Sequence, residues 1–68
     1  MIIMNSQHEV ITKIIKKRKE KGISQQKLAN LIMMPQSTIA RIEAEIVSPR
    51  LETIVLIANV LGLTIDLK

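Results

Sequence analysis

Four side chains between residues 36 and 41 have the chemistry needed to recognise the edges of base pairs. They are Gln36, Ser37, Thr38 and Arg41. At helical spacing they fall on the side opposite Ile39 and Ile42, so one helix would bury the isoleucines and expose the polar groups. Glutamine bonds adenine and arginine bonds guanine through two hydrogen bonds, worth about 1–3 kcal/mol of discrimination against the wrong base. The row predicts a helix that reads the major groove; the alternative is an ordinary polar helix start.

A second group of residues can bind anions because of its charge. The chain has ten Lys and Arg against six Asp and Glu, and six of the ten lie between Lys13 and Lys21. Side chains that neutralise phosphates release counterions, which favours binding to nucleic acid. We therefore take Lys17 and Lys21 as candidate phosphate contacts. A cationic helix can also bind acidic lipids, and such a stretch can simply be a solvated face.

Length and composition exclude several classes of protein. Sixty-eight residues make a single domain, residues 1–68. The chain has no cysteine, and its only histidine is His8, expected at the surface, so we expect no disulfide, metal site or cofactor. It also lacks a glycine-rich phosphate loop and a carboxylate pair with an acid–base partner. We therefore predict no enzyme and assign no catalytic residue.

The distribution of hydrophobic residues further limits the class of protein and the kind of core it can have. No apolar run approaches the ~20 residues that span a bilayer, and no signal peptide is evident, so we expect a cytoplasmic protein with no membrane partner. Hydrophobic residues make up 47% of the chain and none is aromatic, so the core must be aliphatic. A chain this short buries a modest core, which makes oligomerisation its expected support.

The first helical segment is bounded by clear signals. Ser6, with Glu9 three residues later, forms a capping box, and Gly22 stops the helix after a lysine-rich last turn. The residues predicted on its inner face are Ile11, Ile14, Ile15 and Arg18.

Three further helical segments follow from the same kinds of signal. Ser24 suits the N-cap of the second helix, and Pro35 suits the first turn of the third helix. Ser48 and Pro49 mark the start of the fourth helix, which ends at Gly62. The residues predicted on their inner faces are Leu28, Ala29, Ile32, Ile39, Ile42, Leu51, Ile54, Ile57, Ala58 and Leu61.

Residues 63–68 alternate between apolar and polar side chains, which is the period of a strand. A lone strand is not stable, so it would pair with the N-terminal segment "MIIM", with another subunit or with a partner protein. A short fifth helix is the alternative. The sequence thus predicts an all-α fold of four to five short helices, with a possible C-terminal strand.

The segment from residue 22 to residue 43, "GISQQKLANLIMMPQSTIARIE", places two short helices on either side of a tight turn. With the segments around it, it resembles the Cro and phage-repressor family, the XRE-type helix-turn-helix proteins. The helix-turn-helix would span Ser24 to Glu43. The residues that carry the resemblance are Arg18, Gly22, Ser24, Gln25, Leu28, Ala29, Gln36, Ser37, Ile39, Ile42, Glu43, Pro49, Ile54, Ile57, Ala58, Leu61 and Gly62.

The resemblance implies roles at the matching positions. The helix over residues 35–44 would read bases with Gln36, Ser37 and Arg41, while Thr38 would contact a base methyl or the backbone. Ser24 and Gln25, at the start of the preceding helix, would meet one phosphate, and Ser48 and Arg50 would meet another. Arg18 and Glu43 would form a buried structural ion pair.

The sequence departs from the family at several positions. Met33 replaces the glycine usual in the turn, and Glu45 replaces a second glycine that usually ends the third helix. Pro35 stands where Ser or Thr usually caps the third helix. Ala44 stands where a polar residue is common. We therefore expect the third helix to run through Glu45 or Ile46. An Arg41–Glu45 pair is an alternative to base contact by Arg41. We also expect a group of apolar side chains at the surface: Leu31, Met33, Ile46, Val47 and Leu56.

These observations predict a transcriptional repressor that binds double-stranded operator DNA as a homodimer. The fourth helix and the tail would form the dimer surface, since Val55, Leu56 and Val60 exceed what one small core needs. One alternative is a DNA-binding antitoxin whose tail pairs with a toxin. Another is a protein-interaction module built on the same scaffold.

Overall fold

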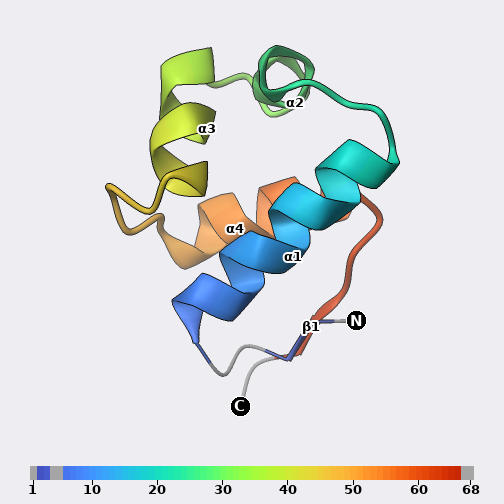
Figure 1. Cartoon of the computed structure of the whole chain (residues 1–68), viewed down its shortest axis with the longest axis vertical. Helices are drawn as coiled ribbons and strands as arrows, with labels where there is room; N and C mark the ends of the chain where they lie inside the picture. The colour runs from blue at the N-terminus through green and yellow to red at the C-terminus, as the bar shows by residue number, and fades with distance from the viewer. Residues whose placement is uncertain (1, 4–5, 67–68) are drawn as a thin grey trace.

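The computed structural model describes residues 2–3 and 6–66 (Figure 1). Within these residues the chain forms four helices and two strands of two residues each. In order they are β1 (Ile2–Ile3), α1 (Gln7–Glu20), α2 (Gln25–Leu31), α3 (Gln36–Glu43), α4 (Leu51–Val60) and β2 (Ile65–Asp66). The predicted all-α helix-turn-helix fold is confirmed. None of the described helices has the length and apolarity needed to cross a membrane.

Helix α1 begins and ends as its capping residues predict. The Ser6 hydroxyl accepts a hydrogen bond from the backbone N–H of Glu9 at 3.2 Å. At the other end Gly22 has a φ of 69°, and the N–H of Ile23 reaches back to the carbonyl of Arg18 at 3.0 Å. The Ser24 hydroxyl caps α2 in the same way, accepting from the N–H of Lys27 at 3.0 Å. These bonds satisfy backbone groups that have no partner inside the helices.

Helices α3 and α4 begin later than predicted. Pro35 is the N-cap of α3, with an extended ψ of 145°, rather than its first helical residue. Ser48 and Pro49 lie before α4, whose N-cap is Arg50; the carbonyl of Arg50 accepts the first helical hydrogen bonds. The inner-face prediction for Leu51 is therefore wrong. In the first turn, at the margin of the core, its side chain is 47% exposed.

The two turn positions without glycine keep the backbone geometry that glycine favours. Met33 has a φ of 59° and Glu45 a φ of 60°. The prediction that the third helix continues through Glu45 or Ile46 is wrong: α3 ends at Glu43 with Ala44 as its C-cap. The N–H of Ile46 instead bonds the carbonyl of Arg41 at 3.0 Å, which closes the helix end around a left-handed residue.

We expect Met33→Gly to stabilise the fold by about 1 kcal/mol, because glycine removes the Cβ that strains a left-handed residue. Urea unfolding followed by circular dichroism would measure this, since the chain has no aromatic fluorophore. Met33→Ala is the matched control. It removes the same long side chain, which is 89% exposed, but keeps the Cβ, so it should bring no gain. Equal effects of the two variants would show that the backbone conformation is not the cause.

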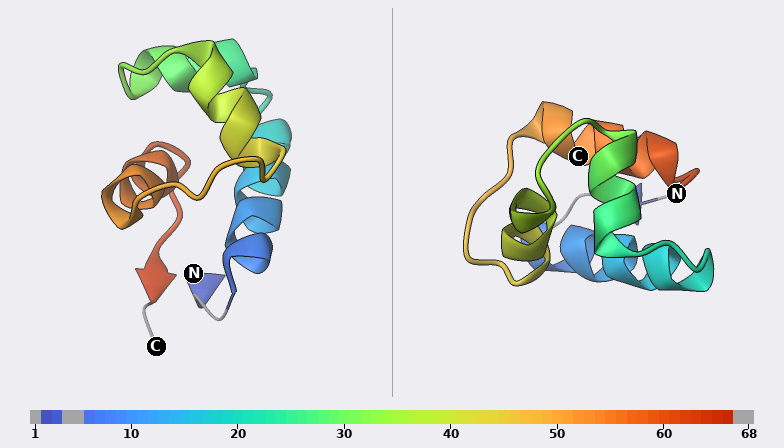
Figure 2. Two further views of the ribbon diagram at one scale, coloured as in Figure 1. Left: turned by 90° about the vertical axis from the view of Figure 1, so that its left-hand side faces the viewer. Right: turned by 90° about the horizontal axis from the view of Figure 1, so that it is seen from above.

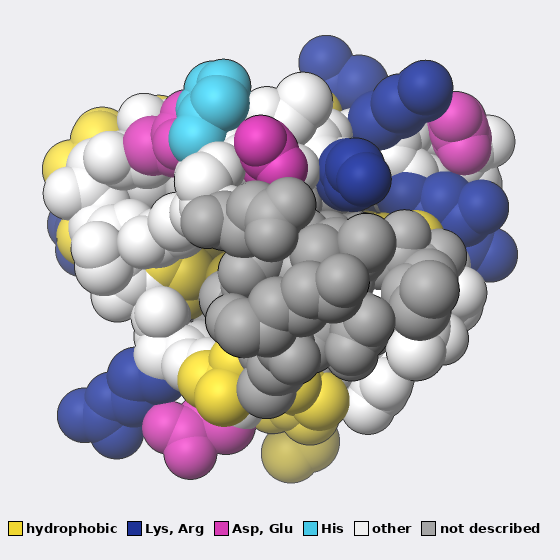
Figure 3. Space-filling model, turned by 90° about the horizontal axis from the view of Figure 1, so that it is seen from below, with side chains coloured by type: hydrophobic (Ala, Val, Ile, Leu, Met, Phe, Trp, Pro, Cys, Tyr) yellow, Lys and Arg dark blue, Asp and Glu magenta, His cyan; other side chains and the backbone are white. Residues whose placement is uncertain are grey.

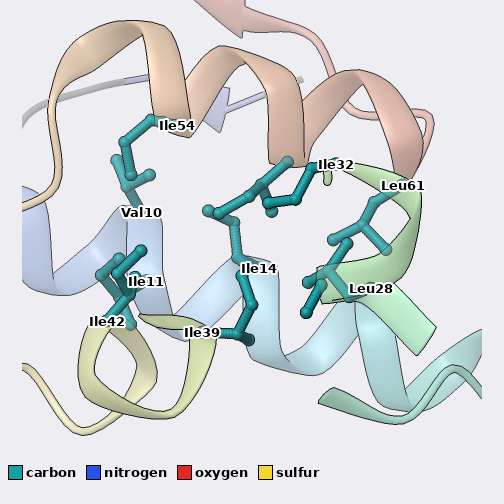
Figure 4. Close-up of a cluster of buried hydrophobic side chains, with 11 residues drawn as sticks. Val10, Ile11, Ile14, Leu28, Ile32, Ile39, Ile42, Ile54 and Leu61 are labelled. Atoms are coloured by element: carbon teal, nitrogen blue, oxygen red, sulfur yellow. The ribbon is translucent and has the colours of Figure 1, made fainter. Parts of the chain in front are cut away.

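All four helices contribute to one aliphatic core (Figure 4). Helices α1 and α4 lie alongside each other, and α2 and α3 close one end of the pair (Figure 2). The buried hydrophobic residues are Val10, Ile11, Ile14, Leu28, Ala29, Ile32, Ile39, Ile42, Ile54, Ile57, Ala58 and Leu61. Apart from Leu51 and the half-buried Ile15, the predicted inward-facing apolar residues all belong to this core. The five apolar residues predicted at the surface are also exposed there.

The tail pairs with the other end of the chain. Strand β2 lies parallel to β1, with Ile2 opposite Ile65 and Ile3 opposite Asp66. The predicted strand is therefore confirmed over its described residues, with the N-terminal segment as its partner. Met1, Met4, Leu67 and Lys68, which complete the two predicted segments, lie outside the described residues. The strands lie at the end of the α1–α4 pair opposite α2 and α3 (Figures 1 and 2).

Candidate nucleic-acid interface

Helix α3 presents one face to the core and the other to solvent. Ile39 and Ile42 are 1% and 2% exposed, which fixes the rotation of the helix about its axis. Gln36, Ser37 and Arg41 are exposed, whereas Thr38 is half-buried at the edge of the face. Eight residues make a helix about 12 Å long, which fits the width of a major groove.

Ala40 belongs to the same outward face, and the sequence analysis missed it. It follows Gln36 by four residues and Ser37 by three, so it lies between them on the helix surface. A methyl group at this position can contact the methyl of thymine. Helical spacing alone could have identified it, but alanine carries no polar group to draw attention.

A buried ion pair holds α3 against α1. The Arg18 guanidinium donates through Nε to Glu43 Oε2 at 2.7 Å and through Nη2 to Glu43 Oε1 at 2.9 Å. Both side chains are nearly buried, at 10% and 7% exposure. Arg18 also donates through Nη1 to the carbonyl of Ile23 at 2.8 Å, just before α2. One arginine thus connects α1, the start of α2 and the end of α3.

Gln25 extends this network to the outward face of α3. Its Nε2 donates to Glu43 Oε1 at 2.9 Å, and its Oε1 accepts from Gln36 Nε2, also at 2.9 Å. The side chain predicted to meet a phosphate therefore uses both polar atoms within the chain. Gln36 keeps its amide oxygen and one N–H for a base. The network sets the direction of the Gln36 side chain before any DNA is bound.

Ser24 serves as the N-cap of α2, as described above, and its hydroxyl remains exposed at the start of that helix. Ser48 and Arg50 are also exposed, in the loop that runs from the end of α3 to α4. That loop leaves α3 at its C-terminal end (Figure 2). The structure thus places these three candidate phosphate contacts on segments that flank α3.

Lys17 and Lys21 lie on the side of α1 that packs against α4. Lys17 is seven residues from Val10, which faces Ile54 of α4 in Figure 4, so the two share a face of α1. The Lys21 Nζ lies 3.9 Å from the position that a Cβ would take on Gly62, at the end of α4. The structure therefore does not bring these two lysines beside the outward face of α3.

Lys19, which the sequence analysis did not single out, lies on a different flank of α1 from Lys17 and Lys21. It follows Ile11 and Ile15 in steps of four residues, and Ile11 lies beside Ile42 of α3 in Figure 4. Its side chain is exposed on that flank of α1. Which lysine faces α3 depends on how α1 is rotated against its neighbours, and the charge pattern alone does not give this.

An unexpected contact fixes the loop that follows α3. Nδ1 of exposed His8 lies 3.0 Å from Oε1 and 2.9 Å from Oε2 of Glu45, joining the first turn of α1 to this loop. Glu45 therefore pairs with His8. The alternative considered from the sequence, a pair between Arg41 and Glu45, is not formed. Among the described residues no carboxylate bonds Arg41, so its guanidinium is available to a ligand.

A buried scaffold, a turn and an outward polar helix together define a helix-turn-helix. The sequence model of the helix-turn-helix family matches residues 14–68, and the chain belongs to this family, in its XRE or Cro-like branch. A comparison with curated proteins found no match. The family binds DNA and is not a family of enzymes, so the protein is a DNA-binding regulator of the XRE type.

Proposed function

We propose that this protein is a sequence-specific transcriptional repressor that places α3 in the major groove and acts as a homodimer. The observation that carries the proposal is the outward face of α3, where exposed Arg41 has no carboxylate bonded to it among the described residues and Gln36 is held by Gln25. Two copies would insert their α3 helices into successive major grooves, about 34–36 Å apart along the duplex.

The departures from the family pattern do not weaken this proposal. Met33 and Glu45 adopt the left-handed conformation that glycine would favour, so the path of the turn and the length of α3 are kept. The Glu45 carboxylate bonds His8 in the first turn of α1, which fixes the loop that follows α3. An interaction module that no longer binds DNA is therefore less well supported.

The antitoxin alternative rests on the resemblance of single domains of this size to DNA-binding antitoxins, and on a strand-like tail that could pair with a toxin. In the described residues that strand already pairs with Ile2–Ile3 of the same chain, which weakens the argument that it binds a toxin. We therefore retain the repressor as the proposed function.

Selection from a pool of randomised duplexes tests the proposal, with Arg41→Ala beside the native chain. We expect enrichment of a two-fold symmetric site, and Arg41→Ala should relax the choice at one base pair per half-site, with a loss of about 1–3 kcal/mol in discrimination. Arg50→Ala is the matched control, because an exposed arginine expected at a phosphate should weaken all sequences alike and reduce the salt dependence. No enriched site for the native chain would refute sequence-specific recognition.

A further inference from the structure

The loop between α3 and α4, residues 44–50, is held mainly at its two ends. At its start the N–H of Ile46 bonds the carbonyl of Arg41 at 3.0 Å, and at its end the carbonyl of Arg50 accepts the first hydrogen bonds of α4. Between these two points the loop backbone forms no hydrogen bond to another described backbone group. Apolar packing adds little, since Ile46 and Val47 are 73% and 41% exposed. A segment with so few anchors depends strongly on each of them.

Among the described residues, the side-chain anchor of the α3–α4 loop is the contact between His8 and Glu45. Nδ1 of His8 lies 3.0 Å from Oε1 and 2.9 Å from Oε2, so one imidazole nitrogen meets both carboxylate oxygens. Glu45 has a φ of 60°, a backbone conformation that a residue with a Cβ rarely adopts. The contact therefore ties the first turn of α1 to the loop whose exposed Ser48 and Arg50 are candidate phosphate contacts.

The charges around His8 make Glu45 its main electrostatic partner. The next positions on the same face of α1 are Ile11 and Thr12, which carry no charge. Figure 3 shows the imidazole, in cyan, beside acidic side chains, while most basic side chains gather on the other side of the view. The charged residues of the elements that meet here are Glu9 on α1, Arg41 and Glu43 on α3, and Glu45 and Arg50 in the loop. Of these only Glu45 bonds His8, and Glu43 is already bonded to Arg18.

We propose that His8 is a positioning residue for the α3–α4 loop, and that through Glu45 it makes DNA binding depend on pH. Imidazole is the side chain whose charge ordinarily changes between about pH 5 and 8, a range in which carboxylates are ionised. At the acidic end a protonated imidazole meets an ionised carboxylate, and such a charge-assisted hydrogen bond is stronger than a neutral one. As the pH rises the imidazole loses its charge and the loop is held less tightly, so DNA affinity falls.

Two features of the chain make this proposal testable. His8 is the only histidine, so one substitution removes every imidazole from the protein. The loop would contact phosphates, which carry no sequence information, so the effect of pH should be the same on every duplex. The inference rests on the proposed function, because DNA reaches this loop when α3 lies in the major groove.

Fluorescence anisotropy of a labelled short duplex of arbitrary sequence tests the proposal on the full chain, at constant ionic strength. We expect the affinity of the native chain to fall about two- to five-fold between about pH 6 and 8, the size that an exposed ion pair can produce. His8→Gln keeps a hydrogen-bond donor but cannot gain a proton, so it should remove this dependence. A flat native profile, or a His8→Gln profile as steep as the native one, would overturn the proposal.

Two glutamine variants distinguish the loop contact from direct attraction between a protonated imidazole and DNA. Glu45→Gln leaves His8 able to gain a proton but removes the opposite charge, so it should also flatten the pH profile. Glu9→Gln is the matched control: it makes the same substitution next to His8, at a carboxylate that does not bond the imidazole, and should keep the native profile. A Glu45→Gln profile as steep as the native one would show direct attraction and overturn the positioning role. Circular dichroism at each pH would establish that all variants are folded.

Failure of this proposal and failure of the proposed function give different results. An enriched symmetric site together with a flat pH profile would overturn only the role of His8. A pH dependence that is lost in both His8→Gln and Glu45→Gln, without any enriched site, would refute only sequence-specific recognition. A native chain that binds no duplex at all would overturn both.

Discussion

Glu43→Ala will lower the free energy of unfolding by about 3–5 kcal/mol, because it leaves the guanidinium of Arg18 buried without its counter-charge. Three hydrogen bonds end on this carboxylate, two from Arg18 and one from Gln25. A 68-residue domain has a total stability of about 3–10 kcal/mol, so this loss would remove a large part of it. Urea titration followed by circular dichroism would measure the loss.

A variant that lacks both charges identifies the cause of that loss. Arg18→Met combined with Glu43→Leu removes both charges and replaces them with apolar groups, which is often close to neutral for a buried pair. The double variant should therefore be much more stable than Glu43→Ala. Glu20→Ala is the matched control, since Glu20 is about half exposed and its ion pair within the described residues, with Lys17, is 3.9 Å long. It should change stability by less than about 1 kcal/mol. A double variant as unstable as Glu43→Ala would refute the buried-charge explanation.

The helices and most of the core follow from local patterns in the sequence. Ser6, Ser24 and Gly22 act through neighbouring backbone groups, so the helix ends that they mark are predictable. Val10 was not predicted in the core, although it is fully buried, and Ile15 was predicted there but is only half-buried. Helix α1 packs against both α3 and α4, so its buried stripe depends on where these two partners lie (Figure 4).

The end of α3 depends on contacts that are distant in sequence. Glu45 takes a left-handed conformation that its residue type does not favour, and its carboxylate bonds His8, 37 residues earlier. No local pattern predicts such a bond. Similarly, the start of α4 at Leu51, and the exposure of that residue, depend on the path of the loop before it.

The candidate interface was predictable to the extent that it depends on one helix. Gln36, Ser37 and Arg41 lie on one face because α3 is a regular helix with two buried isoleucines. The phosphate candidates depend on several elements at once, and this is why Lys17 and Lys21 lie away from α3. The bridge through Gln25 joins residues 18 positions apart and could not be inferred from spacing.

The second large effect is expected at the centre of the core. Ile14→Ala should lower the free energy of unfolding by about 2–5 kcal/mol, because it removes a buried side chain and leaves a cavity. Ile14 is 1% exposed and lies between Ile39 of α3 and Ile32, which follows α2 (Figure 4). The loss would therefore weaken the support of both helices of the helix-turn-helix, and DNA affinity should fall with the folded fraction.

Ile46→Ala is the matched control for this prediction, since it makes the same substitution at a side chain that is 73% exposed. At a protein concentration low enough to exclude association, it should change stability by no more than about 0.5 kcal/mol. Stability and half-site binding, measured on the same samples, distinguish two explanations for weakened binding. If Ile14→Ala lost affinity while remaining fully folded, the core residue would act on the position of α3 and not on stability. Equal losses in the two variants would contradict the assigned core, because burial is the main difference between the two positions.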